Sequence, residues 1–441
     1  MFPHMPKKKR SLFIPILLLA LPVPAWAQPL LTLQEAIGLA MTGNHTVLLS
    51  EEDAAVARNN NTLGNAGFLP TVDVTAGVNG ALNNARQRYA TGEVIDRSAA
   101  GSSTLTSGIG LGWTVFDGFR MFNRRGELRE LEALGDATVQ VARESIAAQV
   151  ARAYYDVVQQ QQVLDVLRET VALSEERVEN ARLKNEVGES SGLEVLQARV
   201  DLNADRSAVL RQEVSLATAR TTLNQLLGRT PETPFAVVDT IIIAGDLDYD
   251  VFRSRALAEN SDLRAAQISR RVAEYTLEEV KSGWYPRVGV NLGYNLTQSE
   301  TEAGLVASNR NSGLSYGVSA SMNLFNGFNT DRETENARIR IAASDIRIAE
   351  LRSRVESDLL RAWTNYENRM ALVALEQENL AIAGQNLDIA LERFRVGAII
   401  PLELREAQTA RVEAESRLVT ARYEAKLAEI ELLRLSGGEM R

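Results

Sequence analysis

The feature that most constrains the fold is an internal duplication, visible as landmarks that recur in the same order in both halves of the chain. The first landmarks recur 216 residues later: Asn44, Gly67 and Pro70 match Asn260, Gly283 and Pro286. The later ones recur after 209 residues, and they are Phe116, Gly118, Phe119, Val187, Gly188, Leu193, Glu194 and Ala198. Two constant offsets on either side of one length change indicate an ancestral unit that was copied. The first half therefore carries seven extra residues between Pro70 and Phe116.

The duplication divides the chain into a first structural repeat at residues 28–236 and a second at residues 237–441. We expect each repeat to contain a helix, two strands and a long helical hairpin. The opening helices are expected at about residues 33–65 and 251–281. No proline lies between Pro70 and Pro231, and such a length normally occurs only in long uninterrupted helices and strands.

The first 27 residues have the pattern of a secretory signal peptide. A basic start at residues 7–10 precedes an almost wholly apolar run at residues 12–25, and Ala25-Trp26-Ala27 gives the small residues that precede cleavage. The alternative is a membrane anchor, but the run is short for one and contains Pro22 and Pro24. We therefore expect an exported protein.

Two runs in each repeat alternate between apolar residues and small or polar ones, at residues 71–79, 104–115, 287–296 and 313–324. A period of two places the two kinds of residue on opposite faces of a strand. Each run has the length of roughly 10 residues that lets a tilted strand cross a bilayer. The polar face is rich in Gly, Ser, Thr and Asn, which favours a water-filled lumen over a half-buried soluble sheet. We expect polar hairpin loops near residues 80–103 and 297–312.

Four strands cannot close a barrel, and an open sheet edge is not tolerated in lipid. The chain must therefore oligomerise if the strands span the membrane, and three copies would supply twelve strands. The predicted fold class is mixed α and β, with a transmembrane β-barrel that continues into a long α-helical coiled-coil barrel. The alternative is a soluble periplasmic coiled-coil scaffold or pump adaptor with a half-buried sheet.

Aromatic side chains gather at the residues where the predicted strands begin and end. This group comprises Phe68, Trp113, Phe116, Phe119, Trp284, Tyr285, Phe325 and Phe328. In a hairpin, entry and exit lie on the same side, which is the arrangement of an aromatic girdle at a membrane interface. Ordinary packing between strands and helices is the alternative explanation.

Long helices follow the strands in both repeats. Apolar residues recur every seven positions in two ladders: Val150, Val157, Leu164, Val171 and Val178, then Leu359, Tyr366, Val373, Leu380, Leu387 and Phe394. Sustained sevens predict coiled-coil packing against neighbouring helices. About 64 residues from position 123 to 186 would form a rod of roughly 95 Å. Gly188 and Gly397 suit left-handed helix ends, and return helices are expected from Gly192 to Leu227 and from Pro401 to Leu435.

The composition argues against enzymes and nucleic-acid-binding proteins. The chain has no cysteine and only two histidines, so thiolate chemistry and histidine-based acid–base or metal chemistry are nearly excluded. The net charge of -9 disfavours a nucleic-acid partner. We expect no catalytic residues, no cofactor and no metal site.

Taken together, the duplication, the Phe116-Asp117-Gly118-Phe119 and Phe325-Asn326-Gly327-Phe328 strand exits and the Val-Gly hairpin tips resemble the TolC family of outer-membrane channels. The resemblance implies a homotrimer in the outer membrane of a Gram-negative bacterium, in contact with its lipid and extending into the periplasm. It implies a passive exit for multidrug efflux or type I protein secretion. The partners would be a periplasmic adaptor protein and an inner-membrane pump of the RND, ABC or MFS type.

In that family, acidic side chains near the second hairpin tip line the constriction of the tunnel, and the matching positions are Glu403 and Glu406. Glu194 is their counterpart in the first repeat. Neither Glu403 nor Glu406 has a Lys or Arg three or four residues away, as a surface helix normally would. Threefold symmetry would turn each into a ring that favours cations. The alternative is that acids simply suit the start of a helix.

The hairpin tips Val187-Gly188 and Val396-Gly397 are candidates for adaptor contact, with simple helix caps as the alternative. Family members often close the entrance with tyrosine and arginine hydrogen bonds. The comparable positions here are Phe394 and Ile399, which cannot form those bonds. The resemblance therefore leaves the means of closure open.

Overall fold

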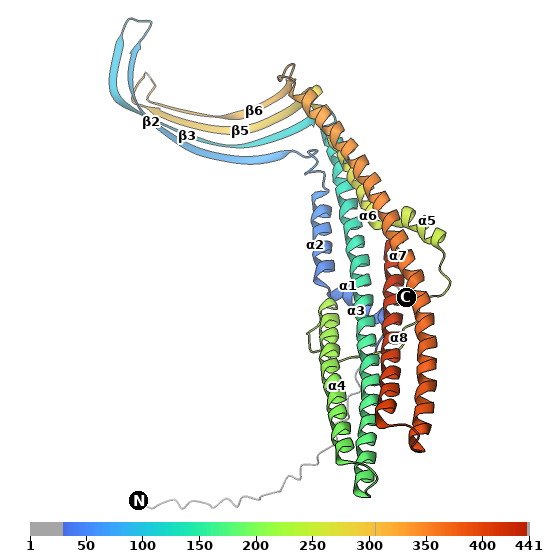
Figure 1. Cartoon of the computed structure of the whole chain (residues 1–441). Helices are drawn as coiled ribbons and strands as arrows, with labels where there is room; N and C mark the ends of the chain where they lie inside the picture. The colour runs from blue at the N-terminus through green and yellow to red at the C-terminus, as the bar shows by residue number, and fades with distance from the viewer. Residues whose placement is uncertain (1–29, 305, 439–441) are drawn as a thin grey trace, which may run out of the picture.

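A four-stranded sheet and a bundle of long helices occupy opposite ends of the molecule (Figure 1). The computed structural model describes residues 30–304 and 306–438, so the predicted signal peptide lies outside the described residues. The first half contains β1 (Leu30–Leu31), α1 (Leu33–Gly43), α2 (His45–Asn60), β2 (Thr71–Arg88), β3 (Val94–Phe116), α3 (Arg120–Glu186) and α4 (Gly192–Leu226). The second contains β4 (Ala236–Val237), α5 (Tyr249–Glu259), α6 (Ser261–Lys281), a 3₁₀ turn (Ser282–Trp284), β5 (Arg287–Thr301), β6 (Ser308–Ser321), α7 (Asn329–Arg395) and α8 (Pro401–Leu435).

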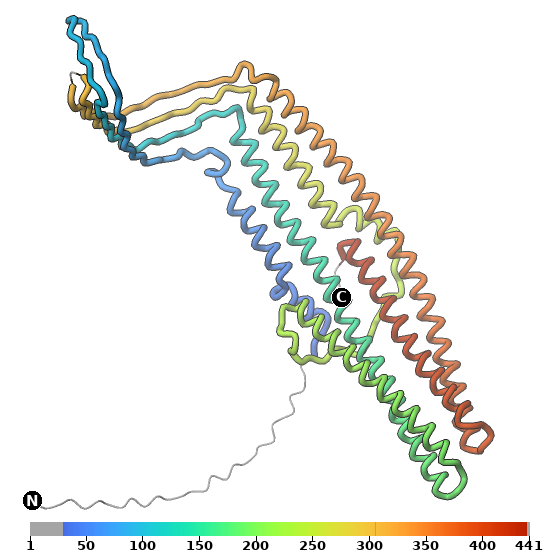
Figure 2. The backbone as a smooth tube through the Cα atoms, turned by 60° about the vertical axis from the view of Figure 1, so that its left-hand side comes forward, coloured from blue at the N-terminus to red at the C-terminus, as the bar shows by residue number. Residues whose placement is uncertain are grey.

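Helices α3 and α7 are the longest elements, with 67 residues each, or about 100 Å at the usual rise per residue. The heptad prediction is confirmed for the buried members of both ladders: Val150, Val157, Leu164, Leu359, Tyr366, Val373 and Leu387. Return helices α4 and α8 run antiparallel to α3 and α7, as Figure 2 shows. Each half thus ends in a helical hairpin whose tip is far from the sheet.

The opening helix of each half is broken, whereas the sequence predicted single helices over residues 33–65 and 251–281. The breaks lie at Asn44 and Asn260, whose side-chain oxygens accept the Thr46 and Leu263 N–H groups at the start of α2 and α6. The amide nitrogen of each also donates to the last turn of the return helix of its own half. The two bonds are Asn44 to the Leu226 carbonyl, 2.8 Å, and Asn260 to the Leu435 carbonyl, 3.2 Å. These long-range bonds satisfy carbonyls that a helix end otherwise leaves unpaired.

The four strands form one antiparallel sheet in the order β2-β3-β5-β6. Strand β3 of the first half pairs with β5 of the second, for example Gly110 with Gly293. At the loop ends the strands are longer than predicted, because the ladders continue well into the segments expected as loops. At its other end β6 is shorter than predicted, since it stops at Ser321 rather than at residue 324. Only residues 89–93 and 302–307 connect the strands of the two hairpins. The backbone of polar residues pairs as readily as that of apolar ones here. The strands therefore continue beyond the residues where the alternation of apolar and polar side chains stops.

The seven extra residues of the first half lie at the tip of the β2–β3 hairpin. The register shifts between Asn83 and Ala85, and Ala99 has a positive φ of 52°. Its N–H donates to the Asn84 side chain, 2.8 Å. A bulge of this kind bends the strand pair, and the end of this hairpin turns away from the sheet in Figure 1.

The largest hydrophobic core lies where α1, α3 and α4 meet near the middle of the bundle. The short strands β1 and β4 pair in parallel beside it. The Tyr154 hydroxyl donates to the Leu31 carbonyl, 3.0 Å, and accepts from the Val238 N–H, 3.1 Å. Among the described residues, none of the helices combines the length and apolar character that crossing a membrane requires.

Candidate functional site

The two hairpin tips, at residues 187–191 and 396–400, have nearly the same geometry. Gly188 and Gly397 adopt positive φ angles of 80° and 73°, which glycine reaches without strain. Their N–H groups donate to the carbonyls of Asn185 and Phe394, both at 3.1 Å. The structure thus places left-handed glycines where the sequence predicted them.

Each tip also carries an exposed valine, Val187 at 71% and Val396 at 78%. Each valine ends its long helix, and the adjoining glycine has open space around it. The tips therefore present a small apolar surface at the end of the molecule farthest from the sheet (Figure 1).

The return helices begin with local signals that fix their first turns. Ser191 caps α4, where its hydroxyl accepts the Glu194 N–H at 3.4 Å, and Pro401 opens α8. Glu194, Glu403 and Glu406 are all exposed. None of the three forms an ion pair with the residues that the structure describes. Within the described chain, no basic side chain neutralises their negative charges, which face the solvent around the tips.

A partly buried charge cluster joins the two helical hairpins above the tips. Arg405 of α8 donates to both carboxylate oxygens of Asp205 on α4, at 2.7 and 3.0 Å. The Ser174 hydroxyl of α3 donates to the same carboxylate, and Arg177 pairs with Asp201 at 2.6 Å. The hydrogen bond to Asp205 raises the pKa of Arg405. Burial lowers the pKa of Arg177, and both guanidinium groups remain charged at neutral pH.

This cluster was missed by the sequence analysis, which examined Phe394 and Ile399 instead. Those two side chains pack in a small core with Leu387 and Leu404. The Lys184 ammonium lies 4.8 Å from the Phe394 ring centroid. The only local signal for the cluster was the pair of aspartates four residues apart on α4; their arginine partners lie on other helices.

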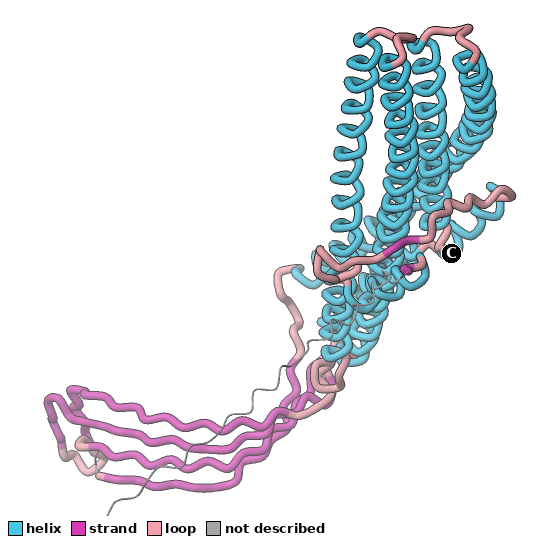
Figure 3. Tube along the Cα trace, turned by 90° about the horizontal axis from the view of Figure 1, so that it is seen from below, coloured by secondary structure: helices cyan, strands magenta, loops and turns pink. Residues whose placement is uncertain are grey.

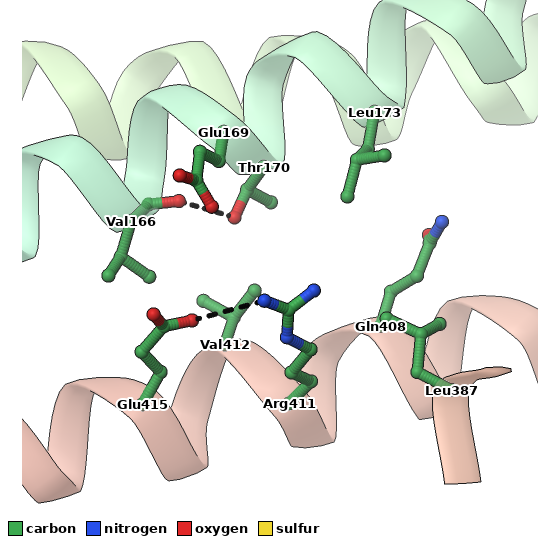
Figure 4. Close-up of a pocket in the computed structure, with 9 residues that line it drawn as sticks. All are labelled: Val166, Glu169, Thr170, Leu173, Leu387, Gln408, Arg411, Val412 and Glu415. Carbon is green, nitrogen blue, oxygen red and sulfur yellow. Dashed lines mark hydrogen bonds and ion pairs between the residues drawn. The ribbon is translucent and has the colours of Figure 1, made fainter. Parts of the chain in front are cut away.

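Helices α3 and α8 face each other beside the cluster. Figure 4 shows Val166 and Leu173 of α3 opposite Gln408 and Val412 of α8. The space between them is about 20 Å³, which is roughly enough for one water molecule. This contact is a packing seam between hairpins rather than a ligand site.

The sheet exposes the apolar face that the alternation predicted. Val74 is 79% exposed and Tyr316 is 83% exposed, with Val72, Val78, Leu314 and Val318 on the same face. Monomeric soluble proteins rarely expose a continuous apolar surface of this extent. Figure 3 shows that none of the described helices covers either face of the sheet.

The predicted aromatic group lies at the junction between sheet and helices. Phe116 contacts Phe119, Phe119 contacts Tyr285, and Phe325 contacts Phe328, with ring centroids 5.3, 6.2 and 5.3 Å apart. The other members, Phe68, Trp113 and Trp284, lie at the same junction, and the Trp113 indole N–H donates to the Phe68 carbonyl at 2.9 Å. Phe122, which the sequence analysis missed, stacks edge-on against Phe68 at 5.0 Å.

The strand exits are sharp turns with the same backbone in both halves. Gly118 and Gly327 have positive φ angles of 73° and 69°, and the following Phe119 and Phe328 also have positive φ. The Asp117 carboxylate accepts the Met121 N–H at 3.1 Å. Such a turn redirects the chain from strand to helix within a few residues, and glycine adopts its left-handed backbone without the steric cost that a side chain adds.

Comparisons with known proteins agree with this architecture. The family model described as outer membrane efflux protein matches residues 36–229 and 252–438. The outer membrane protein TolC of Vibrio cholerae is 25% identical over 98% of this chain and 95% of its own length. The outer membrane efflux protein BepC of Brucella suis is 24% identical over 76% of this chain and 72% of its own. The crystal structure of the CmeC outer membrane channel of Campylobacter jejuni superposes with a TM-score of 0.76 at 14% identity, covering 92% of this chain and 85% of that one.

These matches confirm the resemblance to the TolC family and the predicted fold class. They also exclude the alternative of a periplasmic scaffold or adaptor, because the family match covers both halves of the chain. The chain therefore belongs to the outer membrane efflux protein family, whose members are passive channels of the outer membrane and not enzymes.

Proposed function

We propose that three copies of this chain form a twelve-stranded barrel that continues into a tunnel of helices. One observation carries the proposal: the sheet exposes an apolar face, and its outer strands, β2 and β6, have no partner on their outer sides within the part of the chain that the structure describes. Unpaired backbone groups are too costly in lipid for an open sheet to persist there. Pairing of β6 with β2 of the next copy removes every open edge.

Each structural repeat, at residues 28–236 and 237–441, would supply one hairpin of strands and one hairpin of helices to the assembly. The order of elements supports this division, since each half contains a two-residue strand, two shorter helices, two long strands, one long helix and one return helix. Because each chain supplies two repeats, a trimer would place six nearly equivalent repeats around one axis.

The aromatic group would lie at the periplasmic interface of the membrane. Phe68, Trp113, Phe116, Phe119, Trp284, Tyr285, Phe325 and Phe328 form a layer between the apolar sheet face and the charged helices. Trp and Tyr favour this depth because their apolar ring contacts hydrocarbon while the N–H or O–H group reaches the polar headgroups. The layer would fix the height of the channel in the membrane.

Glu403 and Glu406 would line the entrance of the tunnel, with Glu194 at the corresponding position of the first repeat. Support comes from their position at the tips, their exposure and their lack of an ion-pair partner within the described chain. Three copies would concentrate at least six carboxylates around the axis, and rings of carboxylates favour cations.

The tips themselves would meet a periplasmic adaptor that is coupled to an inner-membrane pump of the RND, ABC or MFS type. Val187, Gly188, Val396 and Gly397 offer an exposed apolar contact on a hydrogen-bonded turn. The channel would then give a passive exit for efflux or secretion, and the pump would select the cargo and supply the energy.

The native mass of the full chain in mild detergent tests the assembly. The proposal expects a particle of three subunits that separates with the outer membrane and requires detergent for extraction. A particle of one subunit would contradict it.

A further inference from the structure

The two outer strands of the sheet can be assigned a pairing register. All 14 residues of β6 are exposed, as is almost all of β2, and neither strand has a partner on its outer side among the described residues. This inference rests on the proposed trimer, since it takes a second copy of the same chain as the occupant of both edges.

The two sequence offsets relate the hairpins of the two halves residue by residue. Adding 216 to a β2 residue and 209 to its β3 partner converts the observed pair Thr71–Gly112 into Arg287–Ser321, which is an observed pair of β5 and β6. The same conversion holds along the whole regular ladder up to Asn83, where the bulge begins. The duplication has therefore preserved the register of strand pairing, not only the order of the strands.

Within the four-stranded sheet of the described chain, the pairing between β3 and β5 is the only one that joins the two halves, and its equivalent must join β6 to β2 of a neighbour. Converting Gly110–Gly293 with the same two offsets gives Ser319 opposite Gly77. We propose that β6 pairs with β2 of the next protomer in this register, with Ser319 opposite Gly77 of the partner subunit and Val318 opposite Val78 of the partner subunit.

The register is consistent with the side chains of both strands. It sets apolar Val318 against Val78 on one face and small Ser319 against Gly77 on the other. A shift by one residue would place apolar side chains against small polar ones throughout, because successive residues point to opposite faces. A shift by two residues would keep the faces but would break the equivalence of the two halves.

The end of the predicted ladder gives independent support. Observed pairing of β3 with β5 ends at Ser102–Thr301, which converts to Asn311 opposite Ala85. Strand β2 leaves its regular ladder with β3 between Asn83 and Ala85. The neighbour's strand would therefore end where the longer hairpin bends away, so the bend does not obstruct the pairing.

Helices show the same relation between paired and unpaired surfaces. On α7, Leu375 and Ile382 are 53% and 58% exposed. Their equivalents 209 residues earlier are Val166 and Leu173, which face α8 within the chain (Figure 4). The α7 face that no described helix covers is thus the counterpart of the α3 face that packs against α8. A second copy of the chain is the partner that fits this α7 face.

Disulfide trapping tests the register directly, because the natural chain has no cysteine. Gly77→Cys with Ser319→Cys, and separately Val78→Cys with Val318→Cys, introduce one predicted pair on each face. Opposed residues have Cα atoms about 4.5–5.5 Å apart, within the disulfide range. Oxidation of the purified full chain in detergent should give a covalent species of three chains on a non-reducing gel, which a reductant removes.

Shifted pairs provide the matched controls. Gly77→Cys with Gly317→Cys, and with Ser321→Cys, move the partner by two residues to about 7–8 Å, so cross-linking should fall at least about fivefold. Native mass is measured on the same samples. Three-subunit particles that cross-link best through a shifted pair would overturn the register and leave the trimer intact. Single subunits without cross-links would contradict the proposed trimer itself.

Discussion

Arg405 on α8 donates two hydrogen bonds to Asp205 on α4, at 2.7 and 3.0 Å, and so ties the second helical hairpin to the first near their tips. Both side chains are largely buried, with 22% and 12% of their surface exposed. The equivalent positions in the opposite repeat are Leu196 and Ala414. This charge pair is therefore specific to contact within one chain and has no counterpart in the other half.

Replacing Asp205 with asparagine should destabilise the hairpin pair, because Arg405 would keep its charge and lose its carboxylate. We expect a loss of about 1.5–3 kcal/mol in the free energy of unfolding, typical of a hydrogen bond to a charged group. Denaturant unfolding followed by circular dichroism measures it. Glu179→Gln, which breaks an exposed pair with Arg182, is the control and should change little. A loss of unfolding free energy no greater than that of the control would show that the Arg405–Asp205 contact contributes little to stability.

Glu403→Gln combined with Glu406→Gln should reduce the cation selectivity of the channel. Two uncharged rings would replace two rings of carboxylates at the entrance, so cations would lose their electrostatic advantage. The reversal potential across a planar bilayer under a KCl gradient measures the change. At about 1 M salt the difference from the natural chain should shrink, since charges are then screened within about 3 Å. An unchanged reversal potential at low salt would remove these residues from the constriction.

Val187→Asp combined with Val396→Asp should abolish binding to the periplasmic adaptor and leave the fold intact. Both side chains are exposed, so a carboxylate there costs the isolated chain little, whereas an apolar contact would be lost. Co-purification with the adaptor from the native membrane measures the effect. Val251→Asp on α5, which is also exposed and lies far from the tips in Figure 1, is the matched control. Loss of binding in the control alone would place the contact elsewhere.

Stability should fall at alkaline pH through Tyr423 in the middle of the bundle. Burial, with a smaller contribution from the Asp156 carboxylate, raises the pKa of Tyr423 to about 12. The unfolded chain releases this proton near pH 10, so the folded state binds more protons between pH 10 and 12 and loses stability as the pH rises. Tyr423→Phe should therefore flatten the fall in unfolding free energy over this range by an amount on the order of 1 kcal/mol. If the unfolding free energies of the natural chain and of Tyr423→Phe fell equally between pH 10 and 12, the raised pKa of Tyr423 would be contradicted.

Much of the architecture could be predicted from local patterns. The ladder from Val150 to Leu164 specified one buried face of α3, and the alternation from Val72 to Val78 specified one face of β2. Gly188 and Gly397 marked the tips because few other residues adopt that backbone. These signals are local and repeated, so the second half served as a check on the first.

The remaining features depend on contacts between distant parts of the chain. Asn44 breaks its helix because its side chain bonds to Leu226, 182 residues away, and no local pattern reveals that partner. Arg405 and Asp205 are 200 residues apart and look like ordinary surface charges in the sequence. The strands of the β2–β3 hairpin continued past Val78 because backbone pairing does not require apolar side chains.

Conductance through a planar lipid bilayer tests the central claim most directly, namely that this chain forms a passive pore. The purified full chain, added in detergent without any pump or adaptor, should produce discrete and reproducible conductance steps. At low salt the open pore should conduct cations in preference to anions. Preparations that are folded by circular dichroism and leave the bilayer current at its baseline would contradict the account.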